Sequence, residues 1–267
     1  MRGPHEFRQT IILAAGNGTR LAGANGVPKP LTPVGGVPLV AHALAHARAS
    51  GCVEAVVVVG KHASRVKAAV QEMAVDIRIR FVTTPDPDAP NGVSLLAAEP
   101  VAAPRFFLQM VDHVFAGITL PTLIAEPFRD GEAGRVLVDT TPGADLDVGD
   151  ATKVRLRRDR VVAIGKAIEP WHAIDAGCFA LTSAVFDALR KVRASEPQTV
   201  SSGMRQLAKR GGLCACDLGS VEWVDVDTAA DRDAAERLIG FQRFERSKGS
   251  TGAKGSSSTS VRRQRPR

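Results

Sequence analysis

A glycine-rich turn directly after an apolar run is the first feature of the sequence that could do chemistry. The turn is Leu13-Ala14-Ala15-Gly16-Asn17-Gly18-Thr19-Arg20-Leu21. Glycines in such a turn let backbone N–H groups approach an anion closely, which side chains would prevent. A dinucleotide fingerprint needs a third glycine where Leu21 stands, and a P-loop needs a lysine and then a serine or threonine after its second glycine. The turn therefore predicts a phosphate-binding loop of a different kind.

Acidic residues at two distant places in the chain are the second chemical feature. Asp112 follows the predicted strand Arg105–Met110, and an acid at the carboxyl end of a central parallel strand lies where open α/β sheets bind ligands. Asp225 and Asp227 alternate along a short predicted strand, which places both on one face. Carboxylates that meet phosphate oxygens form the kind of site that Mg²⁺ prefers. The sequence predicts a magnesium site of Asp112 with Asp225 or Asp227, and it does not separate the last two.

Two neighbours of these acids have simpler explanations than metal binding. His113 has no metal-ligand partner at a suitable spacing, so we expect it to form a hydrogen bond beside Asp112. Thr228 and Asp231 have the spacing of a helix capping box. Asp231 is therefore expected to cap the final helix.

These motifs together resemble the opening signature of the sugar-nucleotidyltransferase family. The glycine-rich turn is followed by Pro28-Lys29-Pro30-Leu31 and by Val34-Gly35-Gly36-Val37-Pro38-Leu39. The resemblance implies that residues 13–19 bind a nucleoside triphosphate and that Arg20 forks onto its β- and γ-oxygens. It also implies that Lys29 supplies positive charge at the α-phosphorus and that Asp112 shares Mg²⁺ with an acid of the 225–228 segment. The alternative is an ordinary strand-to-helix turn with two surface cations.

Further stretches resemble the inositol-1-phosphate cytidylyltransferase branch of this family. They are Asn91-Gly92-Val93-Ser94-Leu95-Leu96, Met110-Val111-Asp112-His113-Val114, Gly149-Asp150-Ala151-Thr152-Lys153, Asp175-Ala176-Gly177-Cys178-Phe179 and Asp225-Val226-Asp227-Thr228. The resemblance implies a nucleotide-binding role for Asn91, Gly92 and Ser94. It implies an acceptor-binding role for His113, Lys153 and Asp175. Lys166 would hold the acceptor phosphate, although a surface lysine at the end of a hairpin is the alternative.

The elements that must position these residues alternate between strand and helix in the first half of the chain. Continuous apolar runs such as that at 55–60 are typical of strands covered on both faces. The predicted order is strand Thr10–Ala15, helix Leu39–Ser50, strand Ala55–Gly60, helix Ala63–Met73, strand Ile77–Thr83, helix Val93–Ala98 and strand Arg105–Met110. This βαβαβαβ order predicts an α/β protein with a Rossmann-like, doubly wound and mostly parallel sheet.

The second half is less regular and predicts a small acceptor-binding lobe. Its expected elements are a hairpin of Thr152–Leu156 and Val161–Ile164, the strand Ile174–Leu181, helices near Ala184–Val192 and Met204–Lys209, strands Leu213–Leu218 and Glu222–Val226, and a helix from Thr228. These elements follow the predicted nucleotide-binding half along the chain.

Charge and composition set the domain limits and exclude several classes of protein. The chain of 267 residues has a net charge of +7, but seven basic residues and no acidic one follow Glu245, so the preceding part is neutral. We expect an N-terminal extension at 1–9, a nucleotidyltransferase domain at 10–245 and a disordered basic tail at 246–267. Aromatic residues make up 4% and tyrosine is absent, which argues against a base-stacking surface for nucleic acid.

Features of the sequence also predict where the protein is located and which reaction it catalyses. No apolar run is long enough to cross a bilayer and no signal-peptide core is present, and four cysteines are too few for a disulfide scaffold, so we expect a cytoplasmic enzyme. It would use Mg²⁺ to transfer a nucleoside monophosphate, with CTP favoured as donor, to a phosphorylated polyol such as inositol-1-phosphate. A hexose-1-phosphate or phosphocholine acceptor, and a nucleotide sensor without turnover, remain alternatives. The oligomeric state is not predicted.

Overall fold

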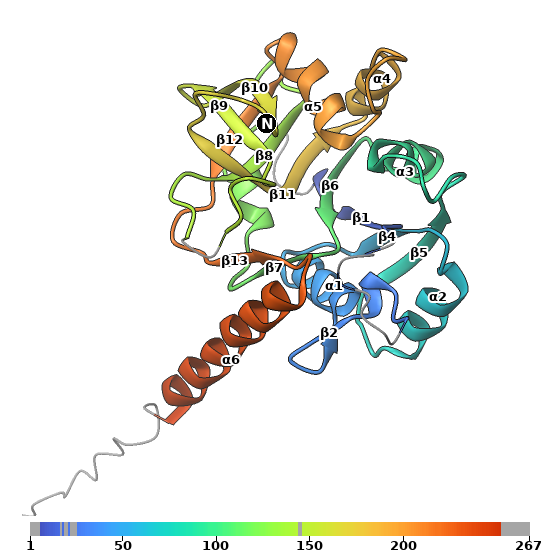
Figure 1. Cartoon of the computed structure of the whole chain (residues 1–267), viewed down its shortest axis with the longest axis vertical. Helices are drawn as coiled ribbons and strands as arrows, with labels where there is room; N and C mark the ends of the chain where they lie inside the picture. The colour runs from blue at the N-terminus through green and yellow to red at the C-terminus, as the bar shows by residue number, and fades with distance from the viewer. Residues whose placement is uncertain (1–5, 17, 19–20, 22–25, 144–145, 252–267) are drawn as a thin grey trace, which may run out of the picture.

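A nine-stranded mixed sheet forms the centre of the computed structural model, which describes residues 6–16, 18, 21, 26–143 and 146–251 (Figure 1). The first four strands in sheet order are parallel to their neighbours, and the next strand runs antiparallel to the fourth. The sheet order is β5 (Arg78–Thr83), β4 (Glu54–Val59), β1 (Gln9–Ala14), β6 (Arg105–Met110), β11 (Ala173–Thr182), β8 (Gly134–Asp139), β12 (Leu213–Asp217), β10 (Arg160–Gly165) and β9 (Lys153–Arg157).

Helices cover both faces of the parallel half, and the alternation of side chains along β1 explains why. Ile11 and Leu13 pack into one core with α3, α4 and α5, whereas Ile12 and Ala14 pack into a second core with α1 and α2. A strand buried on both faces needs a continuous apolar sequence, as predicted. The helices are α1 (Leu39–Ala49), α2 (Ala63–Glu72), α3 (Asn91–Ala97), α4 (Ala184–Arg190), α5 (Val200–Lys209) and α6 (Ala229–Thr251), with short 3-10 turns η2 (Lys29–Leu31), η3 (Glu99–Val101) and η4 (Leu120–Ile124).

The Rossmann-like α/β fold is confirmed, and most of the parallel pairing lies in its first half. In the second half β12 pairs parallel with β8, while the other neighbours pair antiparallel. The predicted hairpin is present as β9 and β10, and it lies at the far edge of the sheet from β5 (Figure 1). The buried central strand β8 was not assigned from the sequence, although its six residues are all buried.

Short elements outside the main sheet position the polar residues. β7 (His113–Phe115) pairs antiparallel with β13 (Trp223–Asp225), and β2 (Pro33–Val34) pairs with β3 (Val37–Pro38). α6 begins directly after this region and projects away from the sheet (Figure 1). It ends at Thr251, so it covers the start of the segment assigned to the tail, and residues 252–267 lie outside the described part. Within the described ranges, no helix combines the length and the apolar character that a membrane span requires.

Candidate active site

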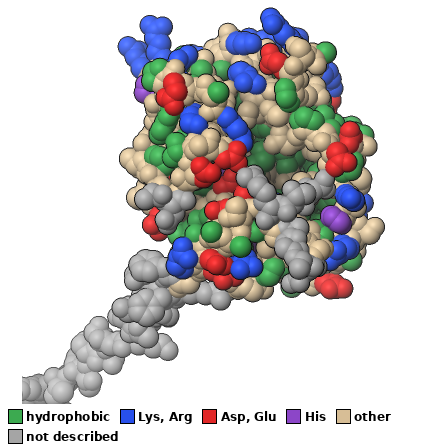
Figure 2. Space-filling model, in the orientation of Figure 1, with side chains coloured by type: hydrophobic (Ala, Val, Ile, Leu, Met, Phe, Trp, Pro, Cys, Tyr) green, Lys and Arg blue, Asp and Glu red, His purple; other side chains and the backbone are tan. Residues whose placement is uncertain are grey.

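Two adjoining pockets open where β1 and β6 end, at the carboxyl edge of the parallel strands. The larger has a volume of about 1090 Å³ and the smaller about 400 Å³. Figure 2 shows acidic side chains gathered beside a hollow near the middle of the face in view. Four residues line both pockets and so mark their junction: Asn91, Met110, Asp112 and Asp227.

The smaller pocket contains most of the described part of the predicted nucleotide site. Its lining includes Leu13, Ala15, Gly16, Gly18, Asn91 and Ser94. Asn17, Thr19 and Arg20 lie outside the described residues. Gly18 has φ +58°, and a Cβ there would lie 2.3 Å from Cβ of Lys29, so both its conformation and its packing require glycine.

Two residues assigned to the nucleotide site, Ala14 and Gly92, make packing contacts within the protein. Ala14 is buried in the core that contains α1 and α2. A Cβ on Gly92 would lie 2.3 Å from the carbonyl oxygen of Gln198, so this glycine allows α3 to approach the segment before α5. Neither residue lines the smaller pocket.

Lys29 lies at the junction of the two pockets, between two carboxylates. Its Nζ donates to Oδ2 of Asp112 at 2.5 Å and also to Oδ1 of Asp227. The Lys29 side chain is 7% exposed, against 23% for Asp112 and 27% for Asp227. Burial alone would lower the pKa of Lys29, but the carboxylates of Asp112 and Asp227 outweigh it and raise that pKa. The ammonium is therefore charged in the site.

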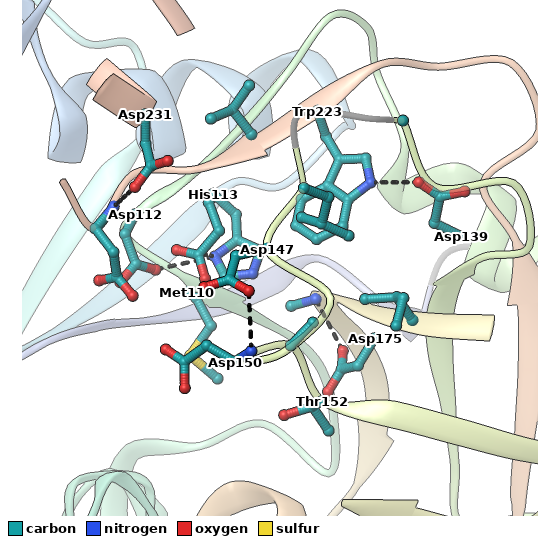
Figure 3. Close-up of a pocket in the computed structure, with 18 of the residues that line it drawn as sticks. Met110, Asp112, His113, Asp139, Asp147, Asp150, Thr152, Asp175, Trp223 and Asp231 are labelled. Atoms are coloured by element: carbon teal, nitrogen blue, oxygen red, sulfur yellow. Dashed lines mark hydrogen bonds and ion pairs between the residues drawn. The ribbon is translucent and has the colours of Figure 1, made fainter. Parts of the chain in front are cut away.

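Asp112 is held on both of its oxygens. Lys29 binds Oδ2, and Nδ1 of His113 donates to Oδ1 at 3.0 Å (Figure 3). Burial alone would raise the pKa of Asp112, but the Lys29 ammonium and the His113 contact hold it well below its usual range. The hydrogen bond between His113 and Asp112 is the one expected from the sequence.

Pairing between β7 and β13 brings the second acidic segment to Asp112. Asp225 lies opposite His113 in the ladder, and the amide of Val226 donates to the carbonyl of Asp112 at 3.0 Å. Burial alone would lower the pKa of His113, but Asp225 and Asp112 raise it to about 9. Both acids expected at the metal site, Asp225 and Asp227, are thereby placed next to Asp112.

The Thr228–Asp231 capping box forms as the spacing predicts. Oδ2 of Asp231 accepts from the Thr228 amide at 2.7 Å, and the Asp231 amide donates to Oγ1 of Thr228 at 3.2 Å. The same carboxylate accepts from the Asp227 amide at 3.1 Å. The cap of α6 therefore also fixes the backbone of Asp227.

Asp175 enters the larger pocket from β11. Its Oδ1 accepts from the Gly177 amide at 2.8 Å, and burial raises its pKa to about 6. Gly177 has φ +71°, and a Cβ there would lie 2.4 Å from the ring of His113. The glycine therefore lets the His113 ring pack against this bend of β11.

The two predicted acceptor lysines have different surroundings. Lys166 lines the larger pocket and forms an ion pair with Oδ1 of Asp150, and its side chain is 61% exposed. Lys153 is buried, and its Nζ donates to the carbonyl of Lys166 at 2.9 Å. Lys153 does not line the larger pocket, so its contact holds the end of the β9–β10 hairpin.

Some pocket residues were not identified from the sequence. Trp223 stacks on His113 with ring centroids 5.3 Å apart, and its Nε1 donates to Oδ2 of Asp139 at 2.8 Å (Figure 3). Asp150, the partner of Lys166, also lines the larger pocket. Asp139 ends β8, the unassigned strand, so an acid directly after its apolar run was the signal available.

Carboxylate oxygens at the junction suit a hard divalent ion. Ligand atoms of Asp112, His113 and Asp225 lie within 4.8 Å of one another. Oδ1 of Asp225 is buried and has no hydrogen-bond partner among the described residues, and it lies 3.8 Å from Nδ1 of His113. The Lys29 ammonium shows that a positive charge is stabilised between Asp112 and Asp227. These residues therefore fit a Mg²⁺ site.

The fold is that of the nucleotidyltransferases, as a solved structure of this class confirms. The inositol-1-phosphate CTP transferase from T. maritima matches with a TM-score of 0.76 and 25% identity, over 89% of this chain and 97% of that one. The chain belongs to the MobA-like NTP transferase domain family, whose sequence model matches residues 10–210. The predicted family resemblance is confirmed.

Two curated relatives match over most of this chain. A protein of Rubrobacter xylanophilus named bifunctional IPC transferase and DIPP synthase is 35% identical over 230 residues, which is 85% of this chain and 51% of the relative. A protein of the same name from Archaeoglobus fulgidus is 32% identical over 88% of this chain and 44% of the relative. The chain thus spans about half the length of these relatives.

Proposed function

We propose that this protein transfers CMP from CTP to inositol-1-phosphate and releases pyrophosphate. The observation that carries the reaction class is the meeting of two pockets at Asp112 and Asp227, with the buried Lys29 ammonium between them. A smaller pocket formed by the glycine-rich turn suits the triphosphate, and the larger pocket suits the acceptor. The names of the Rubrobacter, Archaeoglobus and T. maritima proteins support CTP and inositol phosphate as the substrate pair.

The reaction needs positioning and charge neutralisation rather than a general base. A phosphate monoester is already an anion at neutral pH, so its oxygen can attack the α-phosphorus directly while pyrophosphate leaves on the opposite side. Lys29 neutralises charge that gathers at the α-phosphate, and Lys166 binds the acceptor phosphate. In this proposal Arg20 binds the β- and γ-phosphates.

Asp112 and Asp227, with Asp225 beside them, are the residues that would hold Mg²⁺. When bound there, the ion would help to offset the negative charge that develops in the transition state. Asp112 is suited to this role because His113 fixes the orientation of its carboxylate.

We assign binding of the acceptor's ring to the carboxylates and amides of the larger pocket. Asp175 offers hydrogen-bond acceptors to vicinal hydroxyls, and a site built on such bonds discriminates strongly against acceptors that lack hydroxyls. Lys153, placed behind Lys166, supports the acceptor site by fixing the Lys166 backbone. We place the reaction in the cytoplasm, where nucleoside triphosphates are made.

The test is pyrophosphate release from each nucleoside triphosphate with inositol-1-phosphate, glucose-1-phosphate and phosphocholine offered together. Mass spectrometry of the products should show CDP-inositol as the main product. Another main product would replace the proposed substrate pair. Binding of nucleotide without any pyrophosphate release would identify a sensor instead.

A further inference from the structure

The Lys29 ammonium lies between the carboxylates of Asp112 and Asp227. Its Nζ bonds both carboxylates, and its side chain is more deeply buried than either of them. Both aspartates line the smaller and the larger pocket, whereas Lys29 lines the smaller one. The ammonium therefore approaches the carboxylate pair from the nucleotide side.

We propose that Lys29 is the resident cation of the Asp112–Asp227 pair in the nucleotide-free protein, and that it excludes a divalent ion until a triphosphate draws it away. The inference rests on the metal role proposed above for the two aspartates. It adds an order of events: the divalent ion enters the site together with the nucleotide rather than before it.

For electrostatic reasons, the Asp112–Asp227 pair can hold either the Lys29 ammonium or a divalent ion, but not both. Both are cations, and they would compete for the same carboxylate oxygens at a distance where their mutual repulsion is strong. If the ion entered alone, Lys29 would lose its two partners while its side chain remained buried, which is unfavourable for a charged group. Triphosphate oxygens remove this obstacle because they provide new charge-assisted hydrogen bonds to the ammonium.

The packing of the Lys29 stem allows this exchange. An added Cβ on Gly18 would lie 2.3 Å from Cβ, 3.0 Å from Cγ and 3.1 Å from Cδ of Lys29, so the stem rests directly on the backbone of the glycine-rich turn. Gly16, Gly18 and Lys29 line the same pocket. The end of the side chain can therefore move from the carboxylates to phosphates bound by that turn while the stem stays in place.

The experiment measures Mn²⁺ binding to the nucleotide-free protein by electron paramagnetic resonance, with no turnover involved. Lys29→Met should bind Mn²⁺ at least about tenfold more tightly than the wild type, because the ammonium no longer competes for the carboxylate oxygens. Lys166→Met is the matched control, since it removes a lysine paired with Asp150 in the larger pocket, and it should leave Mn²⁺ affinity unchanged. Adding Asp227→Asn to Lys29→Met should remove the gain. Equal affinity in Lys29→Met and the wild type would overturn the inference.

A second measurement on the wild type does not depend on the folding of Lys29→Met. Water-proton relaxation enhancement distinguishes Mn²⁺ bound to free CTP from Mn²⁺ bound to the protein. The wild type should bind Mn²⁺ at least about tenfold more tightly with CTP than without it. Equal binding with and without CTP contradicts the exchange but leaves the proposed reaction intact. No binding at the protein even with CTP contradicts the metal role in the proposed function.

Discussion

Asp112 is the residue on which the contacts of the site converge. Lys29 binds one of its oxygens, His113 binds the other, and the Val226 amide binds its backbone carbonyl. A carboxylate held in this way keeps one orientation, which is what a metal ligand requires. The side chain is therefore well fixed although it lies in the short link between β6 and β7.

Replacing Asp112 by alanine should lower kcat by about two to four orders of magnitude in a protein that still folds, because transition-state charge stabilisation is lost. Asp227→Ala should behave alike. The measurement is pyrophosphate release at saturating Mg²⁺, with circular dichroism to confirm folding. Near-normal rates in both variants would rule out their assigned role.

Replacing Gly177 by alanine would test whether the orientation of the His113 ring matters for catalysis. Alanine there meets two obstacles: a positive φ of +71° and a contact of 2.4 Å between its Cβ and the His113 ring. Gly131→Ala is the matched control, since it has φ +78° and no atom within 4 Å of the added Cβ. The backbone strain costs about 1 kcal/mol in both variants.

We expect Gly177→Ala to lower kcat/KM about tenfold or more, while Gly131→Ala only lowers the melting temperature by a few degrees. Steady-state kinetics and thermal melts of both variants separate the two effects. Equal kcat/KM in the two variants would show that displacement of the His113 ring is harmless to catalysis.

At the scale of elements, the β7–β13 pair completes the site. It joins residues just after β6 to a segment near the end of the chain, and its ladder places Asp225 opposite His113. The alternation of Asp225 and Asp227 was visible in the sequence. Which strand they pair with was not, because β7 has three residues and no pattern that reveals its register.

The predictable parts of the fold are those with strong local signals. β1, β4, β6 and α1 begin and end within a residue or so of their predicted bounds, because apolar runs and flanking glycines define them. The antiparallel pairing of β11 with β6 and β8 depends on tertiary contacts between distant segments. The contact of Lys153 could not be predicted for the same reason, since nothing in the sequence around it reveals that its Nζ donates to the carbonyl of Lys166.

A buried network between α1, β6 and the turn before η4 should make stability depend on pH. Nε2 of His46 accepts from the Thr119 amide at 3.1 Å, so Nδ1 carries the proton donated to Oε1 of Gln109 at 2.7 Å. The imidazole is therefore neutral, and burial lowers its pKa. In the unfolded chain its pKa is about 6.5, so below that pH the unfolded state binds a proton that the folded state does not.

The free energy of unfolding contributed by His46 should therefore fall as the pH drops below about 6.5, by at most about 1.4 kcal/mol per pH unit. In His46→Gln the titrating group is gone. The stability difference between wild type and variant, measured by urea unfolding at pH 5, 6, 7 and 8, should shrink toward pH 5. A difference that stays constant across this range would contradict the assignment.

At the scale of the whole molecule, most of the excess positive charge and the residues assigned to the two pockets lie in different parts of the chain. Of the net charge of +7, five positive charges lie in residues 252–267, beyond the end of α6: Lys254, Arg262, Arg263, Arg265 and Arg267. The residues assigned to the two pockets all precede that segment. Binding of polyanions and turnover should therefore respond separately to its removal.

Deleting residues 252–267 should leave kcat/KM for CTP and acceptor within about twofold, because no residue assigned to either pocket is removed. The salt concentration that elutes the protein from heparin should fall, since fewer basic groups displace counterions from the polyanion. A full-length variant with glutamine at the same five positions is the matched control, and it should elute like the deletion if charge rather than length is responsible. If kcat/KM fell tenfold in the deletion but stayed normal in the glutamine variant, the segment would instead have a role in turnover that depends on its presence and not on its charge.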